Sequence, residues 1–423
     1  MIKIPLPDQT SARRSISRRA VWMFGLGLSL VAAGSTVLLA VGTFFDPALN
    51  RYTMRSSLVW AAIGPHLVLL SLVALAVAFV GVRRGPRRMA EVVAAVAVIA
   101  SIASTFITAQ IVWAIHAAGG HANPISALFI SSIAAARPDL RETYTTVEGQ
   151  PLQASVYRPA RANGAGVDSS AAPVVFYIHG GGWVSGNADT TATNLRWFAD
   201  NGWLVVSIDY RLATAANPTW DKAPRDVACA LSWTAQNAPR LGGDPGHIVV
   251  FGESAGGNLA INLSYGATTG QAESGCGGDL PVPVATVVQY PVVDPQNAYD
   301  HPFPYPASSA KASITTYIGG SPEELPDRMR AISSATYLSK NAPRTLIIEP
   351  ELDGLIPPEG VYGFANRARA AGVDVTLIRI PFANHGFDMG GLVSFLPAAN
   401  SIGNQSRSII QHYLKQRRPV TTP

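Results

Sequence analysis

Long apolar runs without a charged residue alternate with clusters of arginine over the first 118 residues of the chain. About 20 apolar residues are enough for a helix to cross the hydrocarbon core of a bilayer. The pattern therefore predicts three transmembrane helices, at about residues 21–45, 58–82 and 92–118. Each run could instead form a buried helix of a soluble protein, but three such runs in succession argue against that interpretation.

The arginines predict how these helices are oriented. Four precede the first run and four lie between the second and third runs, namely Arg13, Arg14, Arg18, Arg19, Arg83, Arg84, Arg87 and Arg88. Only Arg51 and Arg55 lie between the first and second runs, partly offset by Asp46. Because short cytoplasmic segments retain Lys and Arg, residues 1–20 are expected in the cytoplasm and the chain after residue 119 outside it. A cleaved signal peptide is a competing interpretation of the first run, which is longer than the usual apolar core of about 7–15 residues.

From about residue 140 the pattern changes to short apolar runs of strand length, each followed by a helical segment. These runs are Val174–Ile178, Leu204–Ile208, Ile248–Phe251, Ala285–Gln289, Thr345–Ile348 and Thr376–Ile380. Continuous Val/Ile runs are typical of strands buried on both faces of a mostly parallel sheet. A hairpin is expected around Glu148-Gly149-Gln150. We therefore expect an α/β domain over residues 140–423, after a linker or interfacial helix at 119–139. An insertion at about 295–340 could form a partial lid.

Composition narrows the class of protein. Hydrophobic residues make up 48% of the 423 positions and charged residues 14%, against roughly 25% charged in ordinary globular chains. The net charge of +5 comes largely from arginines beside apolar runs, so nucleic-acid binding is not expected. Two cysteines, Cys229 and Cys276, are too few for a disulfide-dense or zinc-finger framework. A bridge between them is allowed outside the cytoplasm. No metal or cofactor is expected.

A nucleophile motif follows one of the predicted strands. The strand Ile248–Phe251 continues into Gly252-Glu253-Ser254-Ala255-Gly256, and a helix-compatible segment comes next. G-x-S-x-G between a strand and a helix holds the serine on a tight turn, with its Oγ exposed near the positive end of the helix. Ser254 is therefore the candidate nucleophile. Its neighbour Glu253 is expected to stabilise the surrounding loops by hydrogen bonds rather than to act on the substrate.

A glycine-rich segment, His179-Gly180-Gly181-Gly182-Trp183, follows the strand Val174–Ile178. Successive glycines let the backbone approach a substrate and turn its N–H groups inward, which is the geometry of an oxyanion hole. We expect the N–H groups of Gly181, Gly182 and Ala255 to be the donors. His179 comes one residue after the strand and is expected to brace this loop.

The general base should come from the chain after the serine, because hydrolases with this nucleophile turn have the order Ser, acid, His. Three histidines qualify: His301, His385 and His412. His301 lies in the predicted insertion, and His412 lies in a C-terminal helical segment flanked by charge. His385 directly follows the last predicted strand, where a loop can present it to Ser254. It is the candidate base.

The acid should follow the penultimate strand. Asp353 lies in the turn Asp-Gly-Leu just beyond that strand and is the favoured candidate. Glu349 and Asp294 remain alternatives, because each comes at or near the end of a predicted strand. In such a triad the carboxylate fixes the tautomer of the imidazole and stabilises the imidazolium that forms.

In combination, these motifs resemble the hormone-sensitive-lipase-like branch of the α/β-hydrolase esterases. HGGGW, GESAGG, Asp353 to Leu355, His385 to Phe387, and Asp209-Tyr210-Arg211-Leu212 carry the resemblance, which covers about residues 140–415. It implies an α/β-hydrolase fold and a carboxylesterase or lipase that acts on a small-molecule or lipid ester through an acyl-enzyme. It also implies the same triad and oxyanion donors. An acyltransferase, an amidase or peptidase, or a non-catalytic interaction module of this fold are the alternatives.

Two departures from the family pattern concern substrate preference. Ala213-Thr214-Ala215 follows the Asp-Tyr-Arg-Leu segment, where the family usually has Ala-Pro-Glu. The predicted membrane spans stand where the family has an N-terminal cap. The sequence therefore predicts a membrane-anchored serine esterase with an extracytoplasmic catalytic domain in contact with the lipid bilayer.

Overall fold

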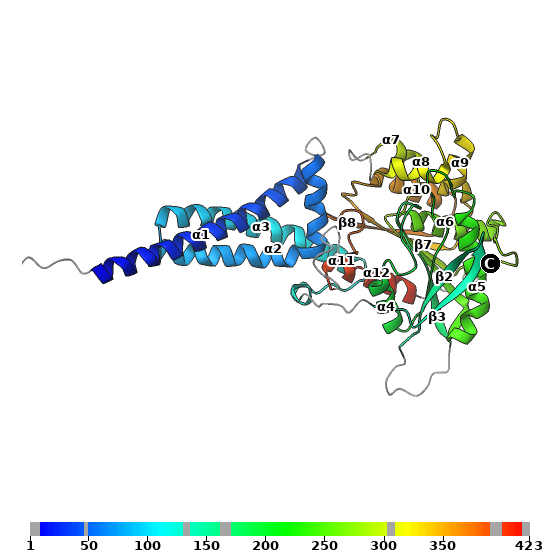
Figure 1. The fold of residues 1–423 in the computed structure, drawn as a ribbon, viewed down its shortest axis with the longest axis horizontal. Coiled ribbons are helices and arrows are strands. Elements are labelled where there is room, and N and C mark those ends of the chain that lie inside the picture. Colours follow the sequence, from blue (N-terminus) through cyan, green and yellow to red (C-terminus); the bar gives the residue numbers. More distant parts are fainter. Residues whose placement is uncertain are drawn as a thin grey trace, which may run out of the picture.

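Three long helices form a bundle beside an α/β domain in the computed structural model (Figure 1). The helices are α1 (Gln9–Phe44), α2 (Asn50–Arg84) and α3 (Arg87–Ala117). The structure describes residues 9–45, 50–129, 136–160, 171–302, 309–389 and 400–416. Within each helix lies a stretch that could span a membrane by its length and composition, over residues 19–44, 56–84 and 87–117.

Small side chains line the inside of the bundle and large apolar side chains cover its outside. Ala33, Ala74 and Ala97 are buried where the three helices meet, whereas Phe24 and Ile102 are about two-thirds exposed. Small residues let helix backbones approach closely, which is the usual basis of helix packing in lipid. The outer surface is apolar enough to face hydrocarbon.

The α/β domain is built on an eight-stranded sheet in the order β1-β2-β4-β3-β5-β6-β7-β8. The first two strands form the predicted hairpin, β2 is antiparallel to β4, and the other neighbouring strands are parallel. This arrangement confirms the predicted α/β-hydrolase fold class. The strands are β1 (Leu140–Val147), β2 (Gln150–Tyr157), β3 (Ala172–Ile178), β4 (Leu204–Ile208), β5 (Gly243–Glu253), β6 (Ala285–Gln289), β7 (Arg344–Pro350) and β8 (Val375–Ile380).

Helices cover both faces of the sheet. The predicted insertion at 295–340 contains three short helices and a 3-10 turn, and its residues 303–308 lie outside the described part. The expected linker at 119–139 contains one 3-10 turn, and its residues 130–135 also lie outside. The elements are η2 (Ser126–Leu128), α4 (Ala192–Asp200), α5 (Ala223–Leu241), α6 (Ala255–Thr269), α7 (Pro295–Asp300), α8 (Ala310–Ile318), α9 (Pro326–Ile332), η4 (Ser334–Tyr337), α10 (Pro358–Ala370), α11 (Ile402–Gln405) and α12 (Arg407–Lys415).

The helical bundle and the α/β domain share a hydrophobic core. Trp60 of α2 and Ile115 of α3 are fully buried in one cluster with Phe198 of α4, Phe251 of β5 and Ile409 of α12. Burial of these large apolar side chains stabilises the contact between the bundle and the domain. The bundle is therefore joined to the domain by packing as well as by the chain.

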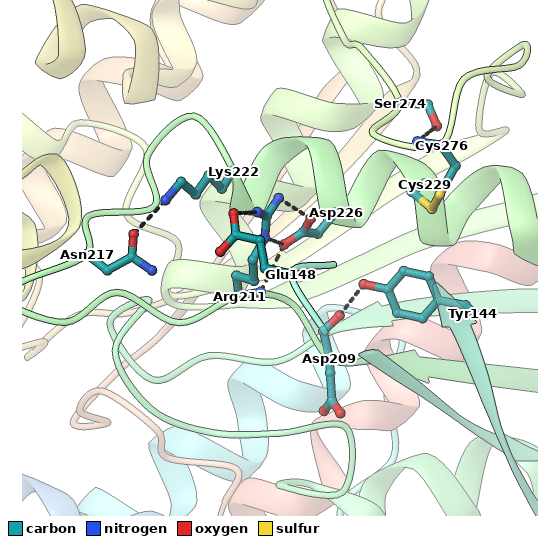
Figure 2. Close-up of polar contacts among 10 residues, drawn as sticks. All are labelled: Tyr144, Glu148, Asp209, Arg211, Asn217, Lys222, Asp226, Cys229, Ser274 and Cys276. Atoms are coloured by element: carbon teal, nitrogen blue, oxygen red, sulfur yellow. Dashed lines mark hydrogen bonds and ion pairs between the residues drawn. A yellow bond between two sulfur atoms is a disulfide. The ribbon is translucent and has the colours of Figure 1, made fainter. Parts of the chain in front are cut away.

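A disulfide links two segments of the α/β domain. Cys229 of α5 is bonded to Cys276, which lies in the loop after α6 (Figure 2). The bridge that the sequence left open is therefore present.

Candidate active site

Ser254 lies on the turn between β5 and α6 in a strained backbone conformation, with φ +54° and ψ −121°. The turn is tight on both sides of the serine. A Cβ at Gly256 would overlap the carbonyl oxygens of Ile178 and His179, and one at Gly252 would overlap the carbonyl oxygen of Gly256. Glycine is therefore required at both positions. Strain of this kind persists where the surrounding structure holds it, often at functional sites.

Ser254, His385 and Asp353 lie together at the carboxyl edge of the sheet. His385, in the loop after β8, has its Nε2 2.9 Å from the Oγ of Ser254. Its Nδ1 lies 2.8 Å from an Oδ atom of Asp353, in the loop after β7. The other oxygen of Asp353 accepts hydrogen bonds from the N–H groups of Leu355 and Ile356. A carboxylate held in this way can orient the imidazole so that Nε2 receives the serine proton.

The alternative acids and bases lie elsewhere. Glu349 is fully buried on β7, and burial, with the nearby charge of Asp353 as the next cause, raises its pKa well above the usual range. Asp294 caps α7 and forms an ion pair with Arg367. The Nδ1 of His301 is hydrogen-bonded to the carbonyl oxygen of Asn297. The Nε2 of His412 is hydrogen-bonded to the side-chain amide of Gln416.

The glycine loop after β3 lies directly against the nucleophile. A Cβ at Gly180 would be 3.3 Å from the Cβ of Ser254. Gly181 and Gly182 have positive φ angles of 111° and 61°, which side chains rarely adopt. In the described part of the chain, the N–H groups of Gly181, Gly182 and Ala255 donate to no backbone carbonyl. They are available to hold an oxyanion.

His179 braces this loop from behind. Its Nδ1 lies 2.7 Å from the carbonyl oxygen of Gly180, and its ring is stacked on that of Tyr210 with centroids 4.3 Å apart. Tyr210 also donates a hydrogen bond to the carbonyl of His179. Burial lowers the pKa of His179. A neutral, enclosed imidazole of this kind positions backbone rather than transferring protons to a substrate.

The segment that contains Tyr210 is itself held by polar contacts (Figure 2). Arg211 forms a bidentate ion pair with the buried Asp226 of α5. Its Nε and Nη2 donate to the two carboxylate oxygens at 2.8 and 2.7 Å. Glu148, at the β1–β2 turn, lies 3.6 Å from the same guanidinium. Tyr144 donates to the carbonyl of Asp209. Two-pronged Arg–carboxylate contacts fix geometry as well as charge, so this segment is a firm support for the glycine loop.

A buried acidic cluster lies beneath the nucleophile turn. Burial, followed by the charge of Asp388, raises the pKa of Glu253 well above the usual range. Burial also raises the pKa of Asp388, which accepts a 2.6 Å hydrogen bond from the hydroxyl of Tyr290. Glu253 is 1% exposed. Among the residues that the structure describes, neither carboxylate oxygen of Glu253 has a hydrogen-bond partner, so the hydrogen bonds expected between Glu253 and the loops are not found. Glu253 contributes to the packing under the turn and does not face a substrate.

Two further residues make contacts around the candidate triad that the sequence does not reveal. Trp183 stacks on Tyr317 of α8, with ring centroids 4.5 Å apart, and so joins the glycine loop to the insertion. Asn384 is fully buried and bridges three segments around the candidate triad. The only sequence signal for Asn384 is an uncharged polar residue directly before the candidate histidine.

Comparisons with known proteins identify the family of this chain. The family model BD-FAE matches residues 162–367. Ethyl acetate hydrolase from Pseudomonas putida is 31% identical over 260 residues, which are 59% of this chain and 76% of that protein. The chain belongs to the hormone-sensitive-lipase-like esterase family. The resemblance of its motifs to this family is thereby confirmed.

Other members and structures extend the likeness. Esterase LipC from Mycobacterium tuberculosis is 32% identical over 235 residues, covering 55% of this chain and 57% of that protein. The chain spans little more than half the length of several such mycobacterial relatives. The solved structure of a thermophilic esterase from Thermogutta terrifontis has a TM-score of 0.51 at 22% identity. The matched region covers 69% of this chain and 96% of the esterase. This likeness supports the α/β-hydrolase fold.

Proposed function

We propose that the protein hydrolyses carboxylic esters through an acyl-enzyme formed on Ser254. One observation carries this proposal: the imidazole of His385 lies between Ser254 and Asp353, at 2.9 and 2.8 Å. A serine hydroxyl is a weak nucleophile until a base removes its proton during attack. This arrangement supplies that base beside the strained turn that carries the hydroxyl.

The reaction has two matching halves. The Oγ of Ser254 attacks the ester carbonyl carbon while His385 takes the hydroxyl proton, and the resulting oxyanion is held by the N–H groups of Gly181, Gly182 and Ala255. His385 then gives the proton to the leaving alcohol as the C–O bond breaks. Water attacks the acyl-enzyme in the same way and releases the acid and free Ser254. Asp353 stabilises the imidazolium in both halves.

The proposed cellular setting is a membrane, with the catalytic domain on its extracytoplasmic side. Helix α2 ends and α3 begins at the end of the bundle remote from the α/β domain (Figure 1). These two helix ends carry Arg83, Arg84, Arg87 and Arg88, which is the distribution expected of a cytoplasmic end. The Cys229–Cys276 disulfide suits an oxidising compartment. Both observations favour the same orientation.

The substrates we propose are esters that reach the enzyme at the bilayer surface. About 20 residues of α3 from Arg87 span the hydrocarbon core, which brings Phe106 to the outer boundary. Phe382, three residues before His385, packs against Phe106 and Phe44 with ring centroids 6.0 and 5.4 Å apart. Phe129, after α3, is 72% exposed. The reaction centre would then lie close to lipid headgroups.

A test uses full-length protein in detergent or lipid nanodiscs with nitrophenyl esters of increasing acyl length. We expect hydrolysis and covalent labelling by a fluorophosphonate. Ser254→Ala should lower kcat by at least about 10⁴-fold and abolish labelling, whereas Ser264→Ala, a buried serine further along α6, should retain both. Folded wild-type protein that neither hydrolyses any of the esters nor reacts with the fluorophosphonate would exclude the proposed chemistry. Product transfer to added alcohols rather than water would favour an acyltransferase.

A further inference from the structure

Asn384 connects the two loops that carry the candidate acid and base. Its Oδ1 accepts hydrogen bonds from the N–H of His385, at 2.7 Å, and from the N–H of Gly354, at 3.0 Å. Gly354 directly follows Asp353, so the amide holds a neighbour of each catalytic candidate. The side chain is fully buried. Its position therefore sets the separation of the two loops.

The third contact of Asn384 crosses to the helical bundle. Its Nδ2 donates a 2.7 Å hydrogen bond to the Oγ of Ser57, on the second turn of α2 and 327 residues away in sequence. Ser57 is 2% exposed. Hydrogen bonds enclosed in this way are electrostatically strong, and an amide donor that loses its buried partner pays the full cost of desolvation.

Packing around this hydrogen bond keeps α2 and the histidine loop in register. Phe387, two residues after His385, is buried in the same cluster as Trp60 and Ala61 of α2. A Cβ at Gly403 of α11 would overlap the carbonyl oxygen of Phe387 and lie 3.3 Å from the Cβ of Ala61. The helix, α11 and the loop therefore meet without spare volume.

We propose that Ser57 and Asn384 are positioning residues for the esterase reaction, so that helix α2 of the membrane bundle forms part of the active-site scaffold. This inference rests on the proposed function, because it concerns the alignment of His385 and Asp353. Ser57 fixes the amide plane of Asn384, and that plane fixes both loops. Small errors in the alignment of catalytic groups can cost about 100-fold in rate.

The test compares variants of α2 in the full-length protein. Ser57→Ala removes the hydroxyl that accepts from Asn384, and Ser57→Thr keeps a hydroxyl at the same carbon. Ser71→Ala is the matched control, because Ser71 is also buried on α2 but is bonded to the carbonyl of Leu67. For each variant we would measure kcat and KM on a short soluble ester. Hydrogen exchange in residues 351–357 and 381–389 would be measured on the same samples.

We expect Ser57→Ala to lower kcat about 10- to 100-fold with KM changed less than about twofold, because binding of a short ester does not depend on the contact. Exchange should accelerate in both loops. Ser57→Thr should restore most of kcat, and Ser71→Ala should match wild type. Wild-type kcat and wild-type exchange in Ser57→Ala would overturn the inference. If the wild type hydrolysed no ester, the proposed function would fail, and the exchange data alone would still decide whether Ser57 holds the loops.

Discussion

Neighbouring carboxylates around the triad have very different surroundings. Asp353 receives two backbone N–H groups and the imidazole of His385. Glu349, four residues earlier on strand β7, accepts no hydrogen bond from any residue that the structure describes. An ionised carboxylate without partners is costly to bury. Asp353 therefore has the hydrogen bonds that hold a carboxylate in place, whereas burial raises the pKa of Glu349 well above its usual range.

Replacing Glu349 should therefore change how stability depends on pH. Because its pKa is raised in the folded state by burial and by Asp353, Glu349 keeps its proton in the folded protein over a pH range above about 4.3 in which the unfolded chain has lost it. Stability contributed by the protonated form is present below that pH and is lost as pH rises. Glu349→Gln removes this loss, so its thermal unfolding midpoint should exceed that of wild type at pH 8 and be close to it at pH 4.5.

Thermal unfolding in one detergent at both pH values measures this difference. Glu351→Gln, at an exposed position on the same segment, is the control and should differ from wild type equally at both. An advantage of Glu349→Gln that did not grow between pH 4.5 and pH 8 would contradict a raised pKa of Glu349 in the folded protein.

At the scale of single residues, the sequence identifies what is local and misses what is distant. Ser254, His385 and Asp353 each follow a predicted strand of a parallel sheet, so their loops must meet at one edge. Their meeting could therefore be anticipated, and their catalytic roles remain predictions. The contact between Asn384 and Ser57 could not be anticipated, because neither residue belongs to a motif and their segments are joined only by tertiary packing.

At the scale of secondary structure, strand positions are the best predicted feature. Leu204–Ile208 and Ala285–Gln289 are strands with the same bounds as the apolar runs, because strands buried on both faces must be apolar throughout. The insertion is less predictable. Its helices α7, α8 and α9 are short, and their positions depend on contacts such as the stacking of Trp183 on Tyr317, which periodicity does not encode.

The disulfide between α5 and the loop after α6 should stabilise the domain without affecting catalysis. It joins residues separated by 47 positions, and restricting a loop of this length in the unfolded chain is worth about 4 kcal/mol. We expect the double variant Cys229→Ser with Cys276→Ser to unfold at a lower temperature and to keep its kcat, because neither cysteine lies in the loops of Ser254, Asp353 or His385.

Thermal unfolding with and without a reductant provides the internal control. Reductant should lower the unfolding midpoint of wild type toward that of the double variant and leave the double variant unchanged. A midpoint in the double variant equal to that of oxidised wild type would show that the bridge contributes no stability.

At the scale of the whole molecule, the helices are longer than a bilayer requires. Helix α2 has 35 residues and α3 has 31, which correspond to about 52 and 46 Å, against a hydrocarbon core of about 30 Å. The excess lies at the end where Trp60 and Ile115 enter the shared core with the α/β domain. The turns of α2 and α3 at this end therefore pack against the α/β domain as well as against the other helices of the bundle.

Because the α/β domain packs against one end of the bundle, single cysteines can show on which side of the membrane each end lies. Both native cysteines are in the disulfide, so a new cysteine would be the only free thiol among the described residues. Arg88 and Glu323 are both exposed, the first at the start of α3 and the second between α8 and α9. If residues 83–88 are cytoplasmic, a membrane-impermeant maleimide should label Glu323→Cys in intact cells and label Arg88→Cys only after permeabilisation. Fluorophosphonate labelling of each variant would establish that it is folded. The reverse pattern would place the active site in the cytoplasm, where the bridge between Cys229 and Cys276 would not be expected to persist.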